Sequence, residues 1–467
     1  MLALLLLVAA SHAYADGELA KYVAQPDPSY HWDIVRSGRV ANGEYIEAIL
    51  TSQTWHDIPW KHQLFLFRPK KIDPGAKQAF LYIDGGRWNP EYETNAEHAL
   101  PRQAAIFTKL ADSLHAPLAI VRQVPFQPIF DRREDALIAY TFQRYFESGD
   151  VDWPLLLPMV KSAVRAMDAA QAIADQQWHL PIERFTVAGA SKRGWTSWLT
   201  TATDPRVAAV APMVIDMLNL PAQIPLQKET FGALSEQVKD YENIDLPGHI
   251  DSDRGRQLVS MVDPYSYRAS LAQPKLILLG TNDHYWPLDA LSLYWPGLTE
   301  PKRVLYVPNQ GHGMNDVDRL IGALSAVHRY SVKNEPLPSV TWTFAPVGNR
   351  LQAEVQTDRK PARVTAWSAS SPTRDFREAR WIQHACTRSR KGFDCVQPVH
   401  RAQYTALYSE VQFKDPGEAA FSLSTAVCIV DAAAVMVRPC LNNSGSGRPA
   451  TPLTSAERPP VAAGRIH

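Results

Sequence analysis

The chain has 467 residues, and its 48 lysines and arginines balance 48 aspartates and glutamates, so the formal net charge at pH 7 is zero. This balance gives no electrostatic support for binding to nucleic acid or to an anionic membrane, and we expect neither partner. Hydrophobic residues make up 45% of the chain and charged residues 21%, which is the composition of a globular protein with a sizeable core.

The chain begins with the segment MLALLLLVAASHAYADG, an apolar run that leads into the motif Ala13-Tyr14-Ala15. This pattern is typical of a secretory signal peptide, and we predict that residues 1–15 are removed before Asp16. The apolar run is too short to span a membrane, and no other segment is apolar enough to do so. The sequence therefore predicts an exported protein, secreted or periplasmic, without a membrane span.

Between about residue 78 and residue 332, short apolar runs alternate with stretches of helical periodicity. The apolar runs are rich in Val, Ile and Leu: AFLYIDGG, PLAIVRQVPF, FTVAGA, RVAAVAPMVID, PKLILLGTND and KRVLYVPNQGHG. Strands of this kind, separated by helices, indicate βαβ units and a sheet covered on both faces. We predict an α/β domain over residues 16–335 with a doubly wound, mostly parallel sheet, and a polar helical insert around residues 225–260.

The pattern changes after the segment KNEPLP. Over residues 338–427, apolar and polar residues alternate with period two and many are β-branched or aromatic, which predicts a small antiparallel β domain of the sandwich type. This domain is a candidate for binding a protein or carbohydrate partner. Residues 428–467 are rich in Ala, Pro, Arg and Ser without periodicity, so we predict a disordered tail.

All four cysteines lie in the last quarter of the chain: Cys386, Cys395, Cys428 and Cys440. In an exported protein the first two are placed to close a local disulfide, although four cysteines allow three pairings. The chain contains neither C-x-x-C nor H-E-x-x-H spacing, so we expect no metal. No glycine-rich nucleotide-binding motif stands in a suitable place, so we expect no organic cofactor.

The segment FTVAGASKRGW, residues 185–195, joins a predicted buried strand to a predicted helix through small residues and Ser191. A serine on such a sharp turn needs small neighbours, which Gly189, Ala190 and Gly194 supply, as in the nucleophile elbow of α/β-hydrolases. The usual motif is G-x-S-x-G, and here the second glycine comes one residue later. A serine at this position is also a common helix N-cap, so the segment alone leaves both roles open.

Two further residues follow predicted strands where an acid and a base would be needed. Asp283 follows LILLGTN, and His312 lies in the loop NQGHGMND after VLYVP. Loops beyond the carboxyl ends of parallel strands meet at one edge of the sheet, and the order Ser191, Asp283, His312 is that of α/β-hydrolases. We predict an α/β-hydrolase-like fold in which Ser191 is the nucleophile, His312 the general base and Asp283 its orienting acid. Asp216, after VAAVAPMVI, is an alternative acid.

The oxyanion hole is predicted to use backbone N–H groups of Lys192, next to the serine, and of Gly85 or Gly86 in the early loop DGGRW. The cations Lys192 and Arg193 would favour an anionic substrate if they faced the pocket. The residues predicted to contact substrate lie on or near the loops of this face and are mostly aromatic: Trp88, Arg193, Trp195, Tyr285 and Trp286.

Four segments give the chain a specific resemblance: GASKRGWT, VDPYSYRASLAQPKLILLGTNDHYWPLDA, YVPNQGHG and AWSASSPTRDFREARW. Over roughly residues 30–427 the chain resembles the PhoPQ-activated pathogenicity-related (PqaA-type) family of the α/β-hydrolase superfamily. The resemblance implies a secreted or periplasmic protein with a hydrolase core and a C-terminal β domain. Bacterial members are associated with resistance to cationic antimicrobial peptides, and a related protein of social amoebae represses cell proliferation.

These observations lead to an expected function and one alternative. We expect an exported serine hydrolase that cleaves an ester or amide bond in a small-molecule ester or a peptide. The spacing around the serine is also similar to that of carbohydrate esterases of the glucuronoyl type. The alternative is a non-catalytic secreted binding or signalling protein on the same scaffold, because a fold does not fix a function.

Overall fold

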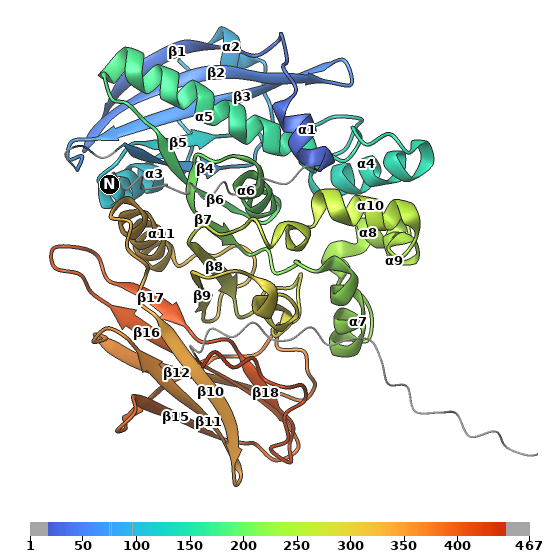
Figure 1. Ribbon diagram of the computed structural model, residues 1–467, viewed down its shortest axis with the longest axis vertical. Helices are drawn as coiled ribbons and strands as arrows, with labels where there is room; N and C mark the ends of the chain where they lie inside the picture. The colour runs from blue at the N-terminus through green and yellow to red at the C-terminus, as the bar shows by residue number, and fades with distance from the viewer. Residues whose placement is uncertain (1–16, 74, 76, 96, 445–467) are drawn as a thin grey trace, which may run out of the picture.

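The computed structural model describes residues 17–73, 75, 77–95 and 97–444 of the chain (Figure 1). The predicted signal peptide lies outside the described residues, and so do residues 445–467 of the predicted tail. Within the described ranges, no helix is long and apolar enough to cross a membrane.

A mixed sheet forms the centre of the molecule. Its first three strands make an antiparallel ribbon, and from β5 onward the neighbours in the order β5-β4-β6-β7-β8-β9 are parallel. The strands are β1 (His31–Val40), β2 (Gly43–Trp55), β3 (Ile58–Pro69), β4 (Gln78–Ile83), β5 (Leu118–Val121), β6 (Arg184–Ala190), β7 (Val207–Met213), β8 (Lys275–Gly280) and β9 (Lys302–Val307). Every residue of β7 and β8 is buried, as expected for parallel strands covered on both faces. The predicted α/β-hydrolase-like fold class is confirmed.

Helices cover both faces of this sheet (Figure 1). One pair is α3 with α11, and the other is α5 with α6. α5 buries most of its length because apolar residues and alanines recur around nearly the whole helix. The helices outside the insert are α1 (Glu18–Ala24), α2 (Glu91–Thr94), α3 (Ala104–Leu114), α4 (Glu134–Ser148), α5 (Leu156–Trp178), α6 (Lys192–Thr203) and α11 (Val317–Val332).

The insert between β7 and β8 forms a helical cap, seen at the right of Figure 1. Its helices are α7 (Leu220–Phe231), α8 (Lys239–Asn243), α9 (Leu246–His249) and α10 (Asp253–Val262). α8 and α10 both contact α4, which holds the cap to the core. The cap lies where β6, β7 and β8 end, and it lines a pocket with residues of the loops that follow these strands.

The C-terminal β module, residues 338–444, contains a separate four-stranded antiparallel sheet in the order β10-β11-β15-β14. A second set of strands joins the central sheet, because Ser424 of β17 pairs with Val304 of β9. The strands are β10 (Val340–Val347), β11 (Arg350–Thr357), β12 (Arg363–Ser371), β13 (Ile382–Ala385), β14 (Thr387–Arg388), β15 (Phe393–Pro398), β16 (Tyr404–Phe413), β17 (Phe421–Ser424) and β18 (Cys428–Val430). The module is therefore an extension of the core sheet as well as a sandwich of its own.

The prediction that disorder begins at residue 428 is wrong for the described part of the tail. β18 pairs with β16, and Trp342 and Asn443 exchange two backbone hydrogen bonds of 2.9 Å. Disulfides join Cys386 to Cys395 and Cys428 to Cys440. This segment is held in place by backbone pairing with distant residues and by a disulfide. The amino-acid composition of the segment does not reveal either interaction.

The pairing of β17 with β9 predicts that the core does not fold without the C-terminal β module. A chain that ends at residue 337 would lose β17, which covers the edge of β9, and would expose Tyr306, which now packs against Tyr408 with ring centroids 5.8 Å apart. We expect this fragment to be insoluble or unfolded by circular dichroism, whereas the full chain gives a cooperative thermal transition. A soluble, monomeric 1–337 fragment with a cooperative unfolding transition would contradict the prediction.

Candidate active site

Ser191 stands at the turn between β6 and α6, at φ 57° and ψ −127°. A residue with a side chain rarely adopts this conformation, and two backbone hydrogen bonds fix it here. The Ser191 N–H donates to the Met213 carbonyl of β7 at 2.8 Å, and the Ser191 carbonyl accepts from the Trp195 N–H at 2.9 Å. Ser191 occupies the N-cap position of α6, but its hydroxyl makes no capping hydrogen bond, so the alternative that this side chain serves to cap the helix is not supported.

Two glycines allow the helix to approach the strands this closely. A Cβ atom on Gly189 would lie 2.6 Å from the Arg193 carbonyl oxygen, and one on Gly194 would lie 2.9 Å from the carbonyl oxygens of Gly189 and Met213. Real Cβ atoms do not approach oxygen so closely, so both positions require glycine. The second glycine stands one residue later than in the usual motif, at the position of α6 that lies against the Gly189 and Met213 carbonyls.

Ser191, His312 and Asp283 form a chain of hydrogen bonds. His312 Nε2 lies 2.7 Å from Ser191 Oγ, and His312 Nδ1 lies 2.9 Å from Asp283 Oδ2. The Tyr285 N–H donates to Asp283 at 2.9 Å, and the Tyr285 ring stacks on the imidazole with ring centroids 4.0 Å apart. The structure thus brings the three predicted residues together and adds Tyr285 as a side wall for the histidine.

The residues predicted for the oxyanion hole border the same space as Ser191. Lys192 is the first residue of α6, where backbone N–H groups have no intrahelical acceptor. Gly85 and Gly86 line an open pocket of about 340 Å³ together with Ser191. A Cβ atom on Gly85 would lie 2.6 Å from the Arg193 guanidinium, and Gly86 has φ +127°, so this loop also requires its glycines.

The two cations after Ser191 are neutralised by α4. Arg193 makes a two-pronged hydrogen bond to Glu134 at 2.7 and 2.8 Å, and Lys192 Nζ lies 2.8 Å from Asp135. Burial tends to raise the pKa of Glu134, but the hydrogen bonds and charge of Arg193 outweigh it and lower that pKa to about 2. These cations would favour an anionic substrate only if they faced it unpaired, and both are instead paired with carboxylates of α4.

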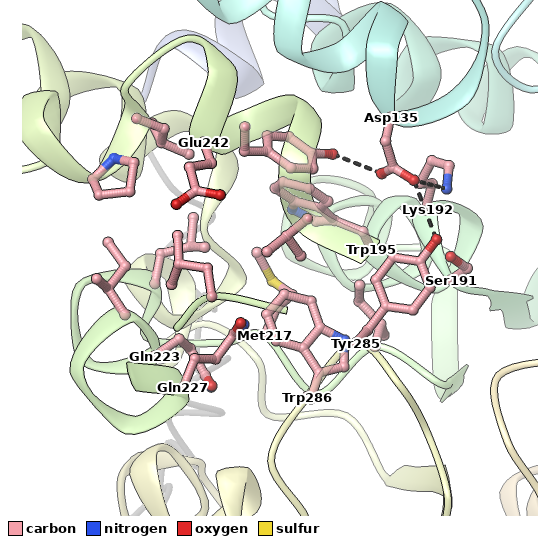
Figure 2. Close-up of a pocket in the computed structure, with 18 of the residues that line it drawn as sticks. Asp135, Ser191, Lys192, Trp195, Met217, Gln223, Gln227, Glu242, Tyr285 and Trp286 are labelled. Carbon is pink, nitrogen blue, oxygen red and sulfur yellow. Dashed lines mark hydrogen bonds and ion pairs between the residues drawn. The ribbon is translucent and has the colours of Figure 1, made fainter. Parts of the chain in front are cut away.

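Asp135 connects the elbow to the cap. It accepts hydrogen bonds from Lys192 at 2.8 Å, from the Tyr241 hydroxyl of α8 at 2.9 Å and from the Tyr285 hydroxyl at 3.4 Å (Figure 2). Burial, followed by the charge of Asp135, raises the pKa of both tyrosines above its ordinary value, so they remain protonated donors. One carboxylate thus fixes the residue after Ser191, the cap, and the ring that stacks on His312.

An apolar pocket of about 80 Å³ opens beside Ser191 and His312 and continues beneath the cap. Figure 2 shows Ser191 and Tyr285 on one side of it and Gln223 and Gln227 of α7 on the opposite side. Its apolar walls come from α4, α6, the end of β7, the cap and the loop after β8: Phe142, Trp195, Met217, Ile224, Leu246 and Trp286. The sequence analysis did not identify the cap residues of this pocket. The apolar positions within the otherwise polar insert were the signal that could have indicated them.

The predicted substrate-contacting residues fall into two groups. Trp195, Tyr285 and Trp286 line the apolar pocket. Trp88 lines neither pocket beside Ser191. Its backbone N–H donates to the Gln127 carbonyl at 2.9 Å, and its ring packs on Phe126 with centroids 5.9 Å apart. The predicted contact of Trp88 with substrate is therefore not supported by its position.

Asp216, the alternative acid, does not hydrogen-bond to His312. It follows β7, lies beneath the loop that carries Asp283, and accepts a hydrogen bond of 2.6 Å from the Tyr294 hydroxyl. Burial raises the pKa of Asp216 to about 8, and the charge of Asp283 adds to this shift against the effect of Tyr294. Among the described residues, only Asp283 provides a carboxylate that hydrogen-bonds to His312.

A second serine–histidine contact is buried between β2, β3 and α5, and its residues line none of the pockets described above. Ser52 Oγ is 3.0 Å from His62 Nε2 and 3.0 Å from Ser162 Oγ, and all three residues are fully buried. Burial lowers the pKa of His62 to about 4, so this group is a neutral part of the contact between β2, β3 and α5. In the part of the chain that the structure describes, no group of three His, Cys, Asp or Glu side chains is placed to hold a metal ion.

Comparisons with known proteins agree with the resemblance noted from the sequence. A profile of the family described as "PhoPQ-activated pathogenicity-related protein" matches residues 19–377. Autocrine proliferation repressor protein A of Dictyostelium discoideum is 30% identical over 402 residues, which cover 80% of this chain and 79% of that protein.

Among solved structures, acetyl xylan esterases show a distant likeness. The enzyme from Paenibacillus sp. R4 has a TM-score of 0.46 and 12% identity over 63% of this chain and 86% of its own. Acetyl xylan esterase 1 from Thermoanaerobacterium sp. JW/SL YS485 has a TM-score of 0.41 and 14% identity over 68% of this chain and 90% of its own. Likeness at this level carries no functional argument.

The raised pKa of the buried Asp216 predicts how the free energy of unfolding depends on pH. Its pKa is about 8 in the folded protein and near 3.8 without the fold, so the unfolded chain binds fewer protons between these values. The contribution of Asp216 to the free energy of unfolding therefore falls as pH rises from 4 to 8. The variant Asp216→Asn lacks this titration, so its stability relative to wild type should rise over this range by at most about 5 kcal/mol. Denaturant unfolding at several pH values measures this difference, and a constant difference would contradict the prediction.

Proposed function

Because the chain belongs to the PhoPQ-activated pathogenicity-related protein family and has an α/β-hydrolase fold, we propose that it is a serine hydrolase. The observation that carries this proposal is the hydrogen-bond chain from Ser191 through His312 to Asp283, with contacts of 2.7 and 2.9 Å. A nucleophile, a base and an orienting acid in this arrangement are the parts needed to form and hydrolyse an acyl-enzyme. The bond cleaved is an ester or an amide.

In this mechanism Ser191 Oγ attacks the substrate carbonyl carbon, and His312 Nε2 takes the hydroxyl proton. Asp283 keeps Nδ1 protonated and stabilises the imidazolium that forms. The backbone N–H groups of Lys192 and of the Gly85–Gly86 loop hold the negative charge on the tetrahedral oxygen. His312 then gives its proton to the leaving alcohol or amine, and a water molecule activated by the same histidine releases the acid.

The apolar pocket supports an assignment of the substrate's acyl group. Its volume of about 80 Å³ is roughly half that of an engineered 150 Å³ cavity that binds benzene, so a short acyl chain fits without rearrangement. Lys192 is the only lysine or arginine among the described lining residues, and Asp135 already pairs with it. The acidic Glu242 also borders the pocket, at an exposed position of α8. The proposed substrate is therefore an ester or amide of a short, uncharged, apolar acid.

We also propose that the protein acts outside the cytoplasm, as the signal-peptide pattern predicts. The two disulfides support this proposal, because structural disulfides persist in the periplasm and in secreted proteins and are rare in reducing compartments. Both join residues of the C-terminal β module.

A fluorophosphonate probe tests the proposed nucleophile directly. We expect covalent labelling of the wild type and no labelling of Ser191→Ala, because the probe reacts with an activated serine. His312→Ala should slow labelling by on the order of 10³-fold or more, and Asp283→Asn should lower hydrolysis about 10⁴-fold. Ser52→Ala is the matched control, since Ser52 also contacts a histidine but is closed to solvent.

A folded wild type that does not react would contradict this function. It would favour the second candidate, a non-catalytic secreted signalling protein, to which the relationship with an autocrine proliferation repressor gives specific support. In that case the next measurement would be a cell-proliferation assay with the purified protein.

A series of p-nitrophenyl esters tests the acyl pocket. We expect kcat/KM to be highest from acetate to butyrate and at least about 10-fold lower for octanoate, because the walls leave no room for a longer chain. Ile224→Ala enlarges the pocket and should move the optimum to longer esters. Activity that rises steadily to octanoate in the wild type would contradict the assignment.

A further inference from the structure

The C-terminal β module contributes one segment to the triad's end of the molecule. We define the strap as residues 372–381, the connection between β12 and β13. It contacts the loop after β8, which carries Asp283, and the loop after β9, which carries His312. The sequence predicted partner binding for this module and gave no sign of such a contact.

We call the loop after β8 the acid loop and the loop after β9 the base loop. The acid loop is held through Asn282, the residue before Asp283. Asn282 Nδ2 donates to the strap carbonyls of Ala379 at 2.7 Å and Arg377 at 3.0 Å. Its Oδ1 accepts a hydrogen bond of 2.8 Å from the Thr281 hydroxyl. Both ends of the Asn282 amide are therefore engaged, and the backbone that leads into Asp283 has little freedom to move.

The base loop is held through Asn309, three residues before His312. The Trp381 N–H donates to Asn309 Oδ1 at 2.8 Å, and Asn309 Nδ2 donates to the Trp381 carbonyl at 3.1 Å. The Asn309 side chain thus pairs with the strap backbone as a neighbouring strand would. Trp381 is itself buried against Tyr408 of β16, with ring centroids 5.3 Å apart, so the anchor is fixed in the β module.

A single hydroxyl links the two loops beneath the strap. The Asn309 N–H donates to Thr281 Oγ1 at 2.9 Å, and the same hydroxyl donates to Asn282. Thr281 is buried, so water does not compete for these hydrogen bonds. The acid loop, the base loop and the strap therefore form one closed network of hydrogen bonds.

The strap also reaches the cap helix that lines the apolar pocket. Arg374, which is 8% exposed, pairs with Glu229 of α7 and with Asp289 at 3.1 Å. The Arg377 guanidinium lies over the ring of Phe231 at 4.1 Å from its centroid. The segment that holds the triad loops therefore holds α7 as well.

From these contacts we propose that the strap is a positioning element of the active site, and that Asn282 and Asn309 are its positioning residues. This inference rests on the proposed hydrolase function for its effect on rate. Reactive groups lose roughly 10²-fold in rate when displaced by about 1 Å, and loops at strand ends move readily unless they are tied down. The β module supplies this restraint across a distance of about a hundred residues in sequence, from Asn282 to the carbonyls of Arg377 and Ala379.

The test compares variants that cut the strap with one that weakens the module elsewhere. Asn282→Ala removes the hold on the acid loop, and Asn309→Asp keeps the acceptor for the Trp381 N–H but removes the donor to its carbonyl. Thr425→Ala is the matched control, because Thr425 is a buried hydrogen-bond partner of Ser409 in the same module and does not touch the strap. Each variant is assayed below its thermal midpoint for fluorophosphonate labelling, for kcat and KM on p-nitrophenyl acetate, and for backbone hydrogen exchange.

We expect Asn282→Ala to slow labelling and lower kcat roughly 10²-fold with KM within twofold of wild type. Hydrogen exchange should accelerate in both residues 281–286 and residues 308–314, because Thr281 joins the loops, while residues 185–195 stay protected. Asn309→Asp should give a smaller effect of the same kind, and Thr425→Ala should give neither. Unchanged exchange and labelling in both asparagine variants would overturn the proposal. If wild type fails to label while exchange responds as expected, the hydrolase function fails and the positioning role stands.

Discussion

The close contact between α6 and the strands β6 and β7 is the constraint on which the site depends. Ser191 can hold φ 57° and ψ −127° only because its N–H and carbonyl are bonded to a strand on one side and a helix on the other. A backbone in this region stores on the order of 1–3 kcal/mol, which the surrounding packing must offset. A glycine at position 191 would relieve that strain, so the conformation is understandable chiefly as a means of presenting the hydroxyl to His312. That argument favours chemistry over a purely binding role.

The charged groups near Ser191 are either paired or neutralised. The cations that follow Ser191 are each matched by a carboxylate of α4, and the resulting pairs bind the elbow to α4 rather than attract charge. Asp216, beneath the acid loop, is held largely protonated near neutral pH by burial, so a second negative charge is kept away from Asp283. The site therefore has one carboxylate that hydrogen-bonds to His312, and a pocket whose walls are mostly apolar. An anionic substrate group would find Lys192, the only lysine or arginine among the described residues of that pocket, already paired with Asp135.

The sequence predicted the triad because its signals are local. A serine among small residues after a strand, an aspartate after the next-but-one strand and a histidine after the last are readable one segment at a time, and the parallel sheet then brings them together. The pairing of Lys192 with Asp135 was not readable, because the partners are 57 positions apart and neither carries a distinctive pattern. The same limit hid the cap wall of the pocket and the folded part of residues 428–444. Trp88 was misplaced for a related reason, since the direction in which a loop turns depends on a carbonyl from another loop.

Periodicity indicated a catalytic domain followed by a separate β domain. This division holds along the sequence, but in three dimensions the two parts are joined. A change from a 3.6-residue to a two-residue period marks where helices stop, but it says nothing about whether the new strands join the old sheet. Here β17 pairs with β9, and the segment between β12 and β13 returns to the loops of Asp283 and His312. Asp283 and His312 come from the core, yet the loops that carry them are hydrogen-bonded to residues that follow the core in sequence. A module with this position needs no partner of its own to explain its presence, since without it the edge of β9 and the two asparagine amides would be left uncovered.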